Sequence, residues 1–225
     1  MELLYQDDRV LVCVKPAGVL STDEPGGMPE LLRAAVGDGA VRSVHRLDRA
    51  VGGLMVYART RRAASDLGAQ MAAGTFHKAY LTVVMGRPDG EAGTLRDFLH
   101  RDRSARISRI VPEGTPLSQE ALLDYRVLAF REGMSLLRVD LRTGRTHQIR
   151  CQLSGHGWPI VGDGKYGGPP SETGVALWSA ELAFGHPRTG ERMRFCRRPP
   201  AEWPWEVFGG VLPGEESRQD RKAHV

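Results

Sequence analysis

The sequence has few cysteines, and they are not arranged in pairs. The three present, Cys13, Cys151 and Cys196, lie far apart in apolar or strand-like surroundings. We interpret them as buried free thiols, because neither a disulfide framework nor the paired Cys or Cys/His spacing of a zinc site is present. Free thiols are typical of a reducing compartment, so we predict a cytoplasmic protein without a structural metal.

Long apolar runs are absent as well. No uninterrupted apolar segment approaches the roughly 20 residues that a membrane helix needs. The first residues carry no basic region followed by an apolar stretch, which is the pattern of a signal peptide. We therefore expect neither export nor a membrane partner.

Lysine is scarce, and arginine supplies most of the positive charge in a chain of net charge +4. The arginines cluster within residues 42–49, 59–62, 96–109 and 138–150. Arginine can hold a phosphate through two parallel hydrogen bonds, so these clusters permit nucleic-acid binding without establishing it. The alternative is a GC-rich genome that favours arginine codons.

Strand-like segments outnumber helical ones. Helices are predicted over Met28–Val36, ending at Gly37, and from a Thr60 N-cap to about residue 73, with Gly74 as the stop. A third, short helix is predicted over residues 147–154, with Thr146 as its N-cap. Apolar or β-branched runs predict strands at residues 10–14, 53–58, 76–85, 119–130, 134–142 and 175–184. The run that ends at residue 184 is the last clear strand.

This pattern predicts an α+β fold with a mixed, mostly antiparallel sheet and few flanking helices. Residues 100–118 lack apolar periodicity and are interpreted as a polar excursion or as short irregular strands. We expect a single domain over residues 1–212 and a charged, disordered tail over residues 213–225. Nothing in the sequence indicates an obligate apolar interface, so a monomer is expected.

One candidate for chemistry is the run His-Arg-Leu-Asp at residues 45–48. Asp48 lies between Arg46 and Arg49, just before the glycine pair Gly52-Gly53. A carboxylate near guanidinium groups stays ionised and can act as a nucleophile or a base. The alternative is a salt-bridge cluster at a surface turn.

Another candidate spans residues 141–150. If a helix begins after Thr146, its free N–H groups favour an anion beside Arg145. His147 and Arg150 would share one helix face, which could meet a carboxylate or a phosphate. The alternative is a solvated basic face.

Two further segments combine polar and aromatic residues. In a strand over residues 76–80, Lys78 and Tyr80 point to the same side, and the tyrosine could stack on a base or serve as a sheet aromatic. Residues 159–167 are rich in turn-forming residues, and Asp163 there could cap backbone N–H groups or touch a substrate.

In this order along the chain, these segments resemble the RluA-type family of RNA pseudouridine synthases. The run at residues 45–48 matches the catalytic signature, and Lys78-Ala79-Tyr80 matches a Lys-x-Tyr strand. The run Thr-Gly-Arg-Thr-His-Gln-Ile-Arg at residues 143–150 matches a third motif, followed by Pro-Ile-Val-Gly-Asp at 159–163. Residues 4–18 look like the opening strand pair. The resemblance runs from about residue 3 to residue 205 and implies a pseudouridine synthase fold with a central active-site cleft.

The resemblance also implies an activity and roles. The enzyme breaks the N-glycosidic bond of a uridine in rRNA or tRNA, turns the base and re-forms the link through carbon, with no redox step and no cofactor. Asp48 acts on the ribose, Tyr80 lies against the base, and Arg150 pairs with Asp48. Arg46 would sit by the RNA and fill the gap left by an extruded nucleotide. Further RNA contacts are expected from His45, Lys78, Arg145 and His147.

Two features depart from the family pattern. Val51-Gly52 stands where Thr-Ser is usual. If the missing hydroxyls only fix the turn, Gly52 can do so through its backbone freedom; if they contact RNA, the choice of RNA differs, so the departure bears on the target more than on the chemistry. The small RNA-binding domain that precedes many relatives is not seen, so the RNA would be held by basic clusters such as residues 101–109. Two alternative functions are an RNA-binding protein without activity and a hydrolase that releases uracil.

Overall fold

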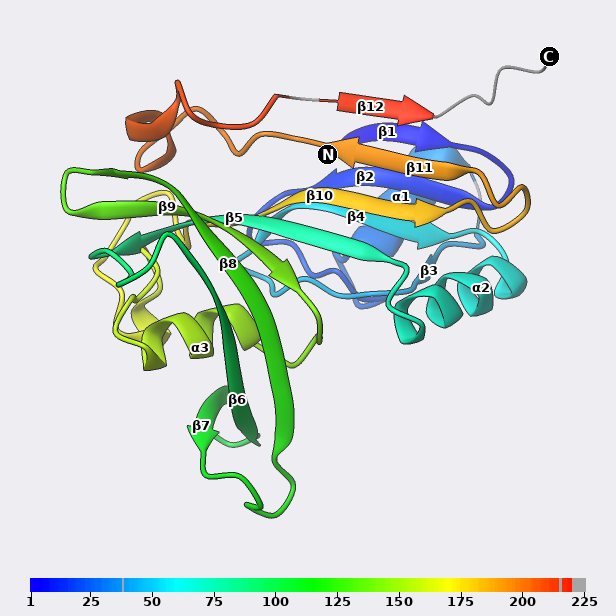
Figure 1. The fold of residues 1–225 in the computed structure, drawn as a ribbon. Coiled ribbons are helices and arrows are strands. Elements are labelled where there is room, and N and C mark those ends of the chain that lie inside the picture. The colour runs from blue at the N-terminus through cyan, green and yellow to red at the C-terminus, as the bar shows by residue number, and fades with distance from the viewer. Residues whose placement is uncertain (38, 215, 220–225) are drawn as a thin grey trace. The chain divides into compact units, whose positions relative to one another are not determined.

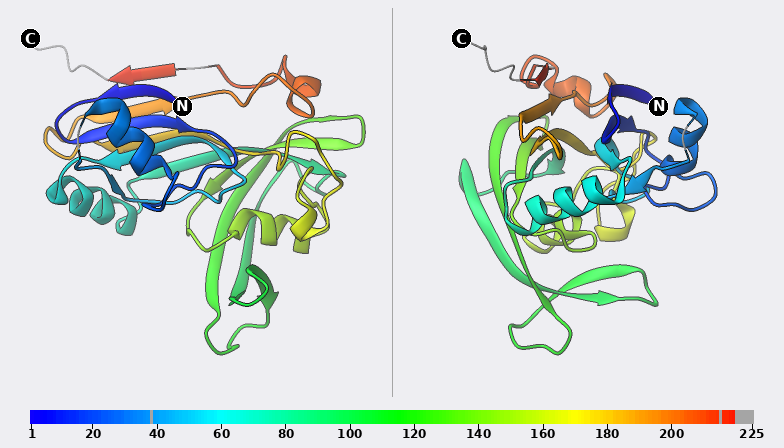
Figure 2. Two further views of the ribbon diagram at one scale, coloured as in Figure 1. Left: turned by 180° about the vertical axis from the view of Figure 1, so that it is seen from behind. Right: turned by 90° about the vertical axis from the view of Figure 1, so that its right-hand side faces the viewer.

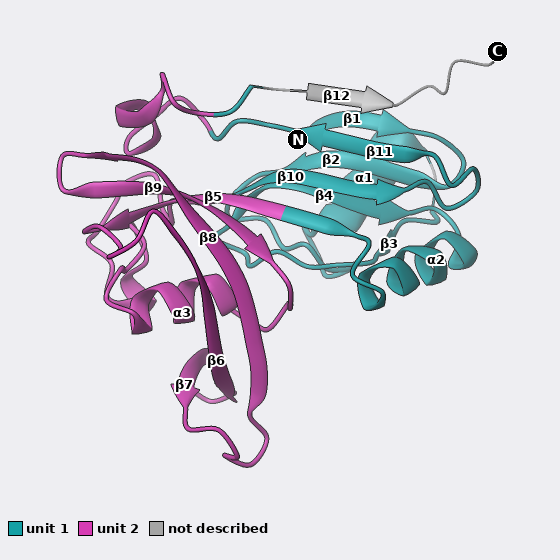
Figure 3. Ribbon diagram, viewed as in Figure 1, with its two compact units in different colours: residues 1–78, 178–199, 213–225 teal, residues 79–177, 200–212 magenta. Residues whose placement is uncertain are grey.

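The computed structural model describes residues 1–37, 39–214 and 216–219, and its mixture of many strands with three α-helices confirms the predicted α+β class. The chain divides into two compact units (Figure 3). Unit 1 comprises residues 1–78, 178–199 and 213–225, and unit 2 comprises residues 79–177 and 200–212. The single domain that the sequence predicted over residues 1–212 stays a prediction.

Unit 1 is built on a sheet in the order β1-β2-β4-β10, extended by β11 and β12, with β3 also paired to β4 (Figure 1). The β4–β10 pair is parallel and the other pairs are antiparallel. The strands of this sheet are β1 Glu2–Gln6, β2 Val10–Lys15, β3 Arg42–Ser43, β4 Gly52–Ala58, β10 Leu177–Gly185, β11 Arg192–Cys196 and β12 Glu216–Gln219.

The core of unit 1 follows from the alternation of its strands. Val10, Val12, Leu54 and Val56 point to one face, where they pack with Leu67 of helix α2, Arg61–Ala72. On the other face, the Tyr57 hydroxyl donates to the carbonyl of Ser21, in the segment that leads into helix α1. Both faces of the central strands are therefore covered, which explains why all of β4 is buried.

Both helices of unit 1 match their sequence predictions and can be followed in Figure 2. Helix α1, Met28–Val36, ends at Gly37 in the left-handed conformation. Helix α2, Arg61–Ala72, begins at Thr60, whose side chain accepts a hydrogen bond from the Ala63 N–H. Both predicted helices are thus confirmed. Their ends could be predicted because they depend on capping by residues close in the chain.

Unit 2 holds an antiparallel sheet in the order β5-β9-β8-β6-β7. In Figure 1, β6 and β8 run on past helix α3, and β7 folds back beside the end of β6. Its elements are β5 His77–Met85, β6 Ala92–Asp102, β7 Ile107–Val111, β8 Gln119–Arg131, β9 Met134–Leu141, α3 Gln148–Gly155, η1 Gly164–Tyr166 and η2 Trp205–Phe208, the first two residues of β5 belonging to unit 1.

Several strands were not predicted as regular strands from the sequence: β3, β6, β7, β11 and β12. Residues 100–118, interpreted as a polar excursion or irregular strands, contain the end of β6 and all of β7 as a regular hairpin. Strand β11 follows β10, which was taken as the last clear strand. The tail predicted to be disordered contains β12, which pairs with β11; residues 215 and 220–225 lie outside the described residues.

Candidate active site

The backbone on either side of Asp48 is fixed by hydrogen bonds within unit 1. Ser21 holds Leu47 on one side: its hydroxyl donates to the Leu47 carbonyl at 2.8 Å and accepts from the Leu47 N–H at 3.2 Å. On the other side, the Arg49 carbonyl accepts from the Gly18 N–H at 2.7 Å. Asp48 itself is half-buried, and its carbonyl accepts from the Val51 N–H at 3.0 Å. The carboxylate is thus carried by a pre-arranged turn, as a reactive group requires.

Lys15 ties this turn to the end of β2. Its fully buried ammonium group donates to the carbonyls of Pro16 at 2.8 Å, Val19 at 2.7 Å and Arg49 at 3.3 Å. Burial lowers the pKa of Lys15 to about 8, against the opposing influence of the Asp48 charge. Lys15 therefore organises the loop from inside and places a positive group near the carboxylate.

His45 lies inside unit 1. Its Nε2 accepts a hydrogen bond from the Val56 N–H at 3.1 Å, and its ring lies 5.8 Å from that of Phe76. Burial lowers the pKa of His45 to about 3, and the charge of Lys78 acts in the same direction. A neutral, buried imidazole that serves a backbone donor favours a structural role over the RNA contact expected from the sequence.

Replacing His45 with glutamine is expected to flatten the acid side of the stability profile. The unfolded histidine takes up a proton near its ordinary pKa of 6.5, whereas the folded one resists until about 3. Between these two values the unfolded state binds more protons than the folded state. The free energy of unfolding of the wild type therefore decreases as the pH falls below about 6.5, and the glutamine variant lacks this decrease. Urea unfolding of both proteins between about pH 7 and pH 4 checks this; parallel profiles would contradict it.

The departure at Val51-Gly52 has a packing explanation. Val51 is buried, and a Cβ on Gly52 would lie 2.6 Å from Cζ3 of Trp178, its partner in β10. The indole is held there by a hydrogen bond of 3.0 Å from Nε1 to the Arg197 carbonyl. Gly52 therefore makes room for Trp178, and it does not supply the backbone freedom that was one of the two alternatives for this position. The left-handed conformation belongs to Gly53, with φ of 115°.

We expect Gly52→Ser to lower the free energy of unfolding by about 1–3 kcal/mol through this overlap. Adding Trp178→Ala should recover part of that loss, because the space becomes free. Gly68→Ser in α2 is the matched control, since a Cβ there meets nothing within 4 Å. Urea unfolding compares the variants, and equal stability of Gly52→Ser and the wild type would contradict the packing explanation.

Arg150 is fixed in unit 2 by a partner that the sequence did not reveal. Its Nε and Nη2 donate to the two carboxylate oxygens of Asp163, each at 2.7 Å, and both side chains are buried. The Tyr166 ring lies against the guanidinium, 5.1 Å from its carbon to the ring centroid. The bidentate pair fixes the plane of the guanidinium. Asp163 thus binds a side chain, where the sequence suggested a backbone cap or a substrate contact.

The start of α3 differs from its prediction. The helix begins at Gln148, and the residue before it is His147, with φ of 54° and no side-chain cap. Thr146 is therefore not the N-cap. Instead, the Gln148 side-chain oxygen accepts from the Thr143 hydroxyl at 2.8 Å and from the Arg145 N–H at 2.9 Å.

The remaining predicted residues are divided between the units. Arg46 is exposed and Lys78 is half-buried in unit 1, and burial lowers the pKa of Lys78. In unit 2, Tyr80 is buried opposite Val139 of β9, and Arg145 donates from Nε to the Glu120 carbonyl at 2.9 Å. His147 contacts the Tyr166 hydroxyl through Nδ1 at 2.9 Å, so His147 and Arg150 share one partner.

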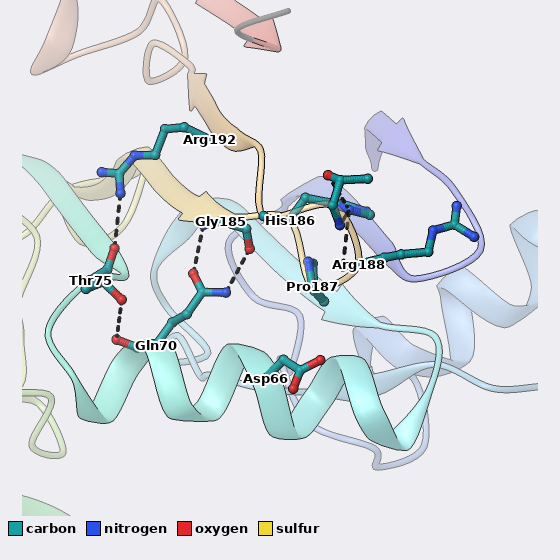
Figure 4. Close-up of a pocket in the computed structure, with 10 residues that line it drawn as sticks. Asp66, Gln70, Thr75, Gly185, His186, Pro187, Arg188 and Arg192 are labelled. Carbon is teal, nitrogen blue, oxygen red and sulfur yellow. Dashed lines mark hydrogen bonds between the residues drawn. The ribbon is translucent and has the colours of Figure 1, made fainter. Parts of the chain in front are cut away.

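A shallow cavity of about 620 Å³ lies elsewhere in unit 1, between α2 and the turn that joins β10 to β11 (Figure 4). The Gln70 side chain bonds to both the N–H and the carbonyl of Gly185, and Arg192 donates to the Thr75 carbonyl. Its polar groups are used to join the helix to the strands, and none of the predicted site residues lines it.

Within the described part of the chain, no group of three or more His, Cys, Asp or Glu side chains is arranged to hold a metal ion. None of the helices described is long and apolar enough to cross a membrane.

Comparison with known proteins identifies the family. The sequence profile described as RNA pseudouridylate synthase matches residues 9–155. An uncharacterized RNA pseudouridine synthase of Bacillus subtilis is 35% identical over 87% of this chain and 71% of its own length. The ribosomal large subunit pseudouridine synthase D of Pseudomonas aeruginosa is 35% identical over 100% of this chain and 74% of its own length.

A third relative, an uncharacterized RNA pseudouridine synthase of Chloroflexus aurantiacus, is 39% identical over 84% of this chain, which spans only 62% of that protein. The fold agrees with a solved structure, human RNA pseudouridylate synthase domain containing 1, with a TM-score of 0.76 at 23% identity, covering 98% of this chain and 91% of that one. The profile and these relatives show that the chain belongs to the RNA pseudouridine synthases, the family that isomerises uridine in RNA to pseudouridine.

Proposed function

We propose that this chain modifies large-subunit ribosomal RNA and that Asp48 is the carboxylate that acts on the ribose of the target uridine. The observation that carries the assignment is the fixed turn on which Asp48 stands, held through Leu47, Arg49 and the buried Lys15. Such a turn holds the carboxylate at one position, as a group that must meet a single sugar carbon requires. The names of relatives such as the Pseudomonas aeruginosa protein support ribosomal RNA as the substrate.

The chemistry balances without an external reactant. The bond from C1′ to N1 of the uracil breaks, the base turns, and a bond from C1′ to C5 forms. N1 gains a proton, the hydrogen of C5 leaves as a proton, and no electron is gained or lost. Asp48 can serve this sequence either by bonding to C1′ or by removing a proton from the sugar, and both routes require the ionised carboxylate.

Tyr80 and Arg150 are proposed as the other two catalytic residues. Tyr80 offers an aromatic face that can lie against a uracil ring, and burial in β5 fixes its position. Arg150 offers a guanidinium whose plane is set by Asp163, so that it can stabilise a carboxylate or developing charge. Both assignments rest on the motifs and on how each side chain is held within unit 2.

RNA contacts are proposed for exposed arginines. Arg46 is exposed two residues before Asp48. The β6–β7 hairpin presents Arg101, Arg103, Arg106 and Arg109, all exposed, and no ion pair holds these four side chains within the described residues. Unpaired arginines are suited to phosphate contacts, which would supply affinity without base specificity.

The substrate assignment can be tested with unmodified transcripts of large-subunit rRNA, small-subunit rRNA and tRNA. Pseudouridine is mapped by reverse-transcription stops after carbodiimide treatment. We expect new stops in the large-subunit transcript alone. Stops confined to tRNA would show that the substrate is tRNA and not large-subunit rRNA. RNA binding without stops on any transcript would favour the alternative that the chain is an RNA-binding protein without activity.

A further inference from the structure

Strand β7 is attached to the segment carrying Arg150 through one buried residue, Ser108. The Ser108 N–H donates to the Tyr166 hydroxyl at 2.8 Å, and its side chain donates to the Thr146 carbonyl at 2.6 Å. The Ser108 carbonyl accepts from the Cys151 thiol at 3.2 Å. The N–H, the carbonyl and the hydroxyl of Ser108 therefore attach the hairpin to η1, to α3 and to Thr146, which precedes α3.

Tyr166 contacts both Ser108 and Arg150. Its ring lies against the Arg150 guanidinium and packs on a small buried cluster formed by Leu99, Ala121 and Cys151. Burial raises the pKa of Tyr166 to about 12, so its hydroxyl keeps its proton at neutral pH. One side chain thus touches the hairpin through its oxygen and Arg150 through its face.

The Tyr166 hydroxyl makes two hydrogen bonds. The Tyr166 oxygen accepts from the Ser108 N–H, which has only a donor to offer. The same hydroxyl makes a hydrogen bond of 2.9 Å with His147 Nδ1, in which the tautomer of the imidazole decides the donor. The hydroxyl therefore joins β7 to the residue that precedes α3, three positions before Arg150.

The same hairpin carries the four exposed arginines that are proposed to contact RNA phosphates. The acid at the turn, Asp102, accepts hydrogen bonds from Ser104 and from the Ala105 N–H. Because that carboxylate is engaged locally, the turn presents mainly positive charge. The same hairpin thus has a basic end and, at Ser108, a buried anchor beside the Arg150 cluster.

We propose that Tyr166 is a positioning residue that couples RNA binding by the β6–β7 hairpin to the placement of Arg150. RNA bound to the hairpin arginines restricts the motion of β7. The hydrogen bond from the Ser108 N–H then fixes the Tyr166 hydroxyl, and the Tyr166 ring fixes the Arg150 guanidinium. The inference rests on the proposed roles of Arg150 and the hairpin.

The test combines Tyr166→Phe with Arg103→Ala/Arg106→Ala, in steady-state assays on the modified rRNA transcript. Tyr166→Phe keeps the ring against Arg150 and removes only the hydroxyl, and we expect kcat to fall about tenfold. In the wild-type background the arginine pair should raise KM and also lower kcat severalfold. In the Tyr166→Phe background the same two arginine substitutions should raise KM without a further fall in kcat, because the hydrogen bond from Ser108 to the Tyr166 hydroxyl is already absent. Arg87→Ala/Arg126→Ala, two exposed arginines of unit 2 outside the arginine clusters, is the matched control and should not lower kcat in either background.

An equal fall in kcat from the arginine pair in both backgrounds would overturn the coupling, as would an unchanged kcat in Tyr166→Phe. If Tyr166→Phe unfolds, Ser108→Ala replaces it: this variant loses only the bond to Thr146, and the same loss of kcat coupling is expected on a smaller scale. Failure of the proposed function is distinguishable, since the wild type would then form no pseudouridine and there would be no kcat to compare.

Discussion

Replacing Asp48 with asparagine is expected to abolish pseudouridine formation while RNA affinity stays close to that of the wild type. Asparagine keeps the size and hydrogen-bonding shape of the side chain, so the turn held by Ser21, Gly18 and Lys15 should persist. It cannot supply the negative charge that either route at the sugar requires. Loss of such a group lowers turnover by about four orders of magnitude or more.

Two measurements check this expectation. Single-turnover assays give the rate of pseudouridine formation, and filter binding gives the RNA affinity. Asp8→Asn is a matched control, because Asp8 is an aspartate of unit 1 that pairs with Arg188 at the surface. Activity of Asp48→Asn within tenfold of the wild type would remove Asp48 from the chemistry.

Replacing Asp163 with alanine is expected to have the second largest effect. Its carboxylate is the bidentate partner of Arg150, and the two side chains are 1% and 5% exposed. Removing one member of a buried pair takes two short hydrogen bonds from the charge that stays, so the free energy of unfolding should fall by about 3–5 kcal/mol. Turnover should fall as well, because the guanidinium is no longer fixed in its plane.

A double variant separates these two effects. Asp163→Leu with Arg150→Met removes both charges, and apolar replacements of a buried pair often restore stability. We expect the double variant to unfold near the wild-type denaturant concentration and to remain inactive. Recovery of activity along with stability would show that the pair serves the fold alone.

Local signals predicted much of the fold. Thr60 and Gly37 mark helix ends because capping depends on neighbouring residues, and both were placed from the sequence. The strands Gln119–Arg131 and Met134–Leu141 were predicted to within one residue at their ends, since a turn at Glu132 and Gly133 separates two strand-like runs. Where neighbours along the chain determine the conformation, the sequence was sufficient.

Elements determined by distant partners were not predicted. Strand β6 shows no regular apolar alternation, and it is held as a strand by long pairings with β8 and β7. The start of α3 was misplaced because the Gln148 side chain takes the role expected of Thr146.

The candidate site divides in the same way. Asp48, Tyr80 and Arg150 were named from motifs, and their catalytic roles remain proposals. The Asp163–Arg150 pair and the Tyr166 contacts depend on how α3 meets η1, and the contact between Gly52 and Trp178 joins strands 126 positions apart in the chain (178 − 52). The glycine-rich loop at residues 159–167 indicated a shaped segment, and only the fold shows that it holds a guanidinium.

If the chain isomerises uridine in RNA through Asp48, the hydrogen of C5 must be released as the new C1′–C5 bond forms, and this release can be measured. Large-subunit rRNA transcribed with [5-³H]uridine is incubated with the wild type and with Asp48→Asn, and tritium in water, pseudouridine in the digest and free uracil are measured together. We predict one tritium released for each pseudouridine formed by the wild type, no free uracil, and neither product with Asp48→Asn. Free uracil without pseudouridine would identify a hydrolase, and equal tritium release by both proteins would contradict the role of Asp48.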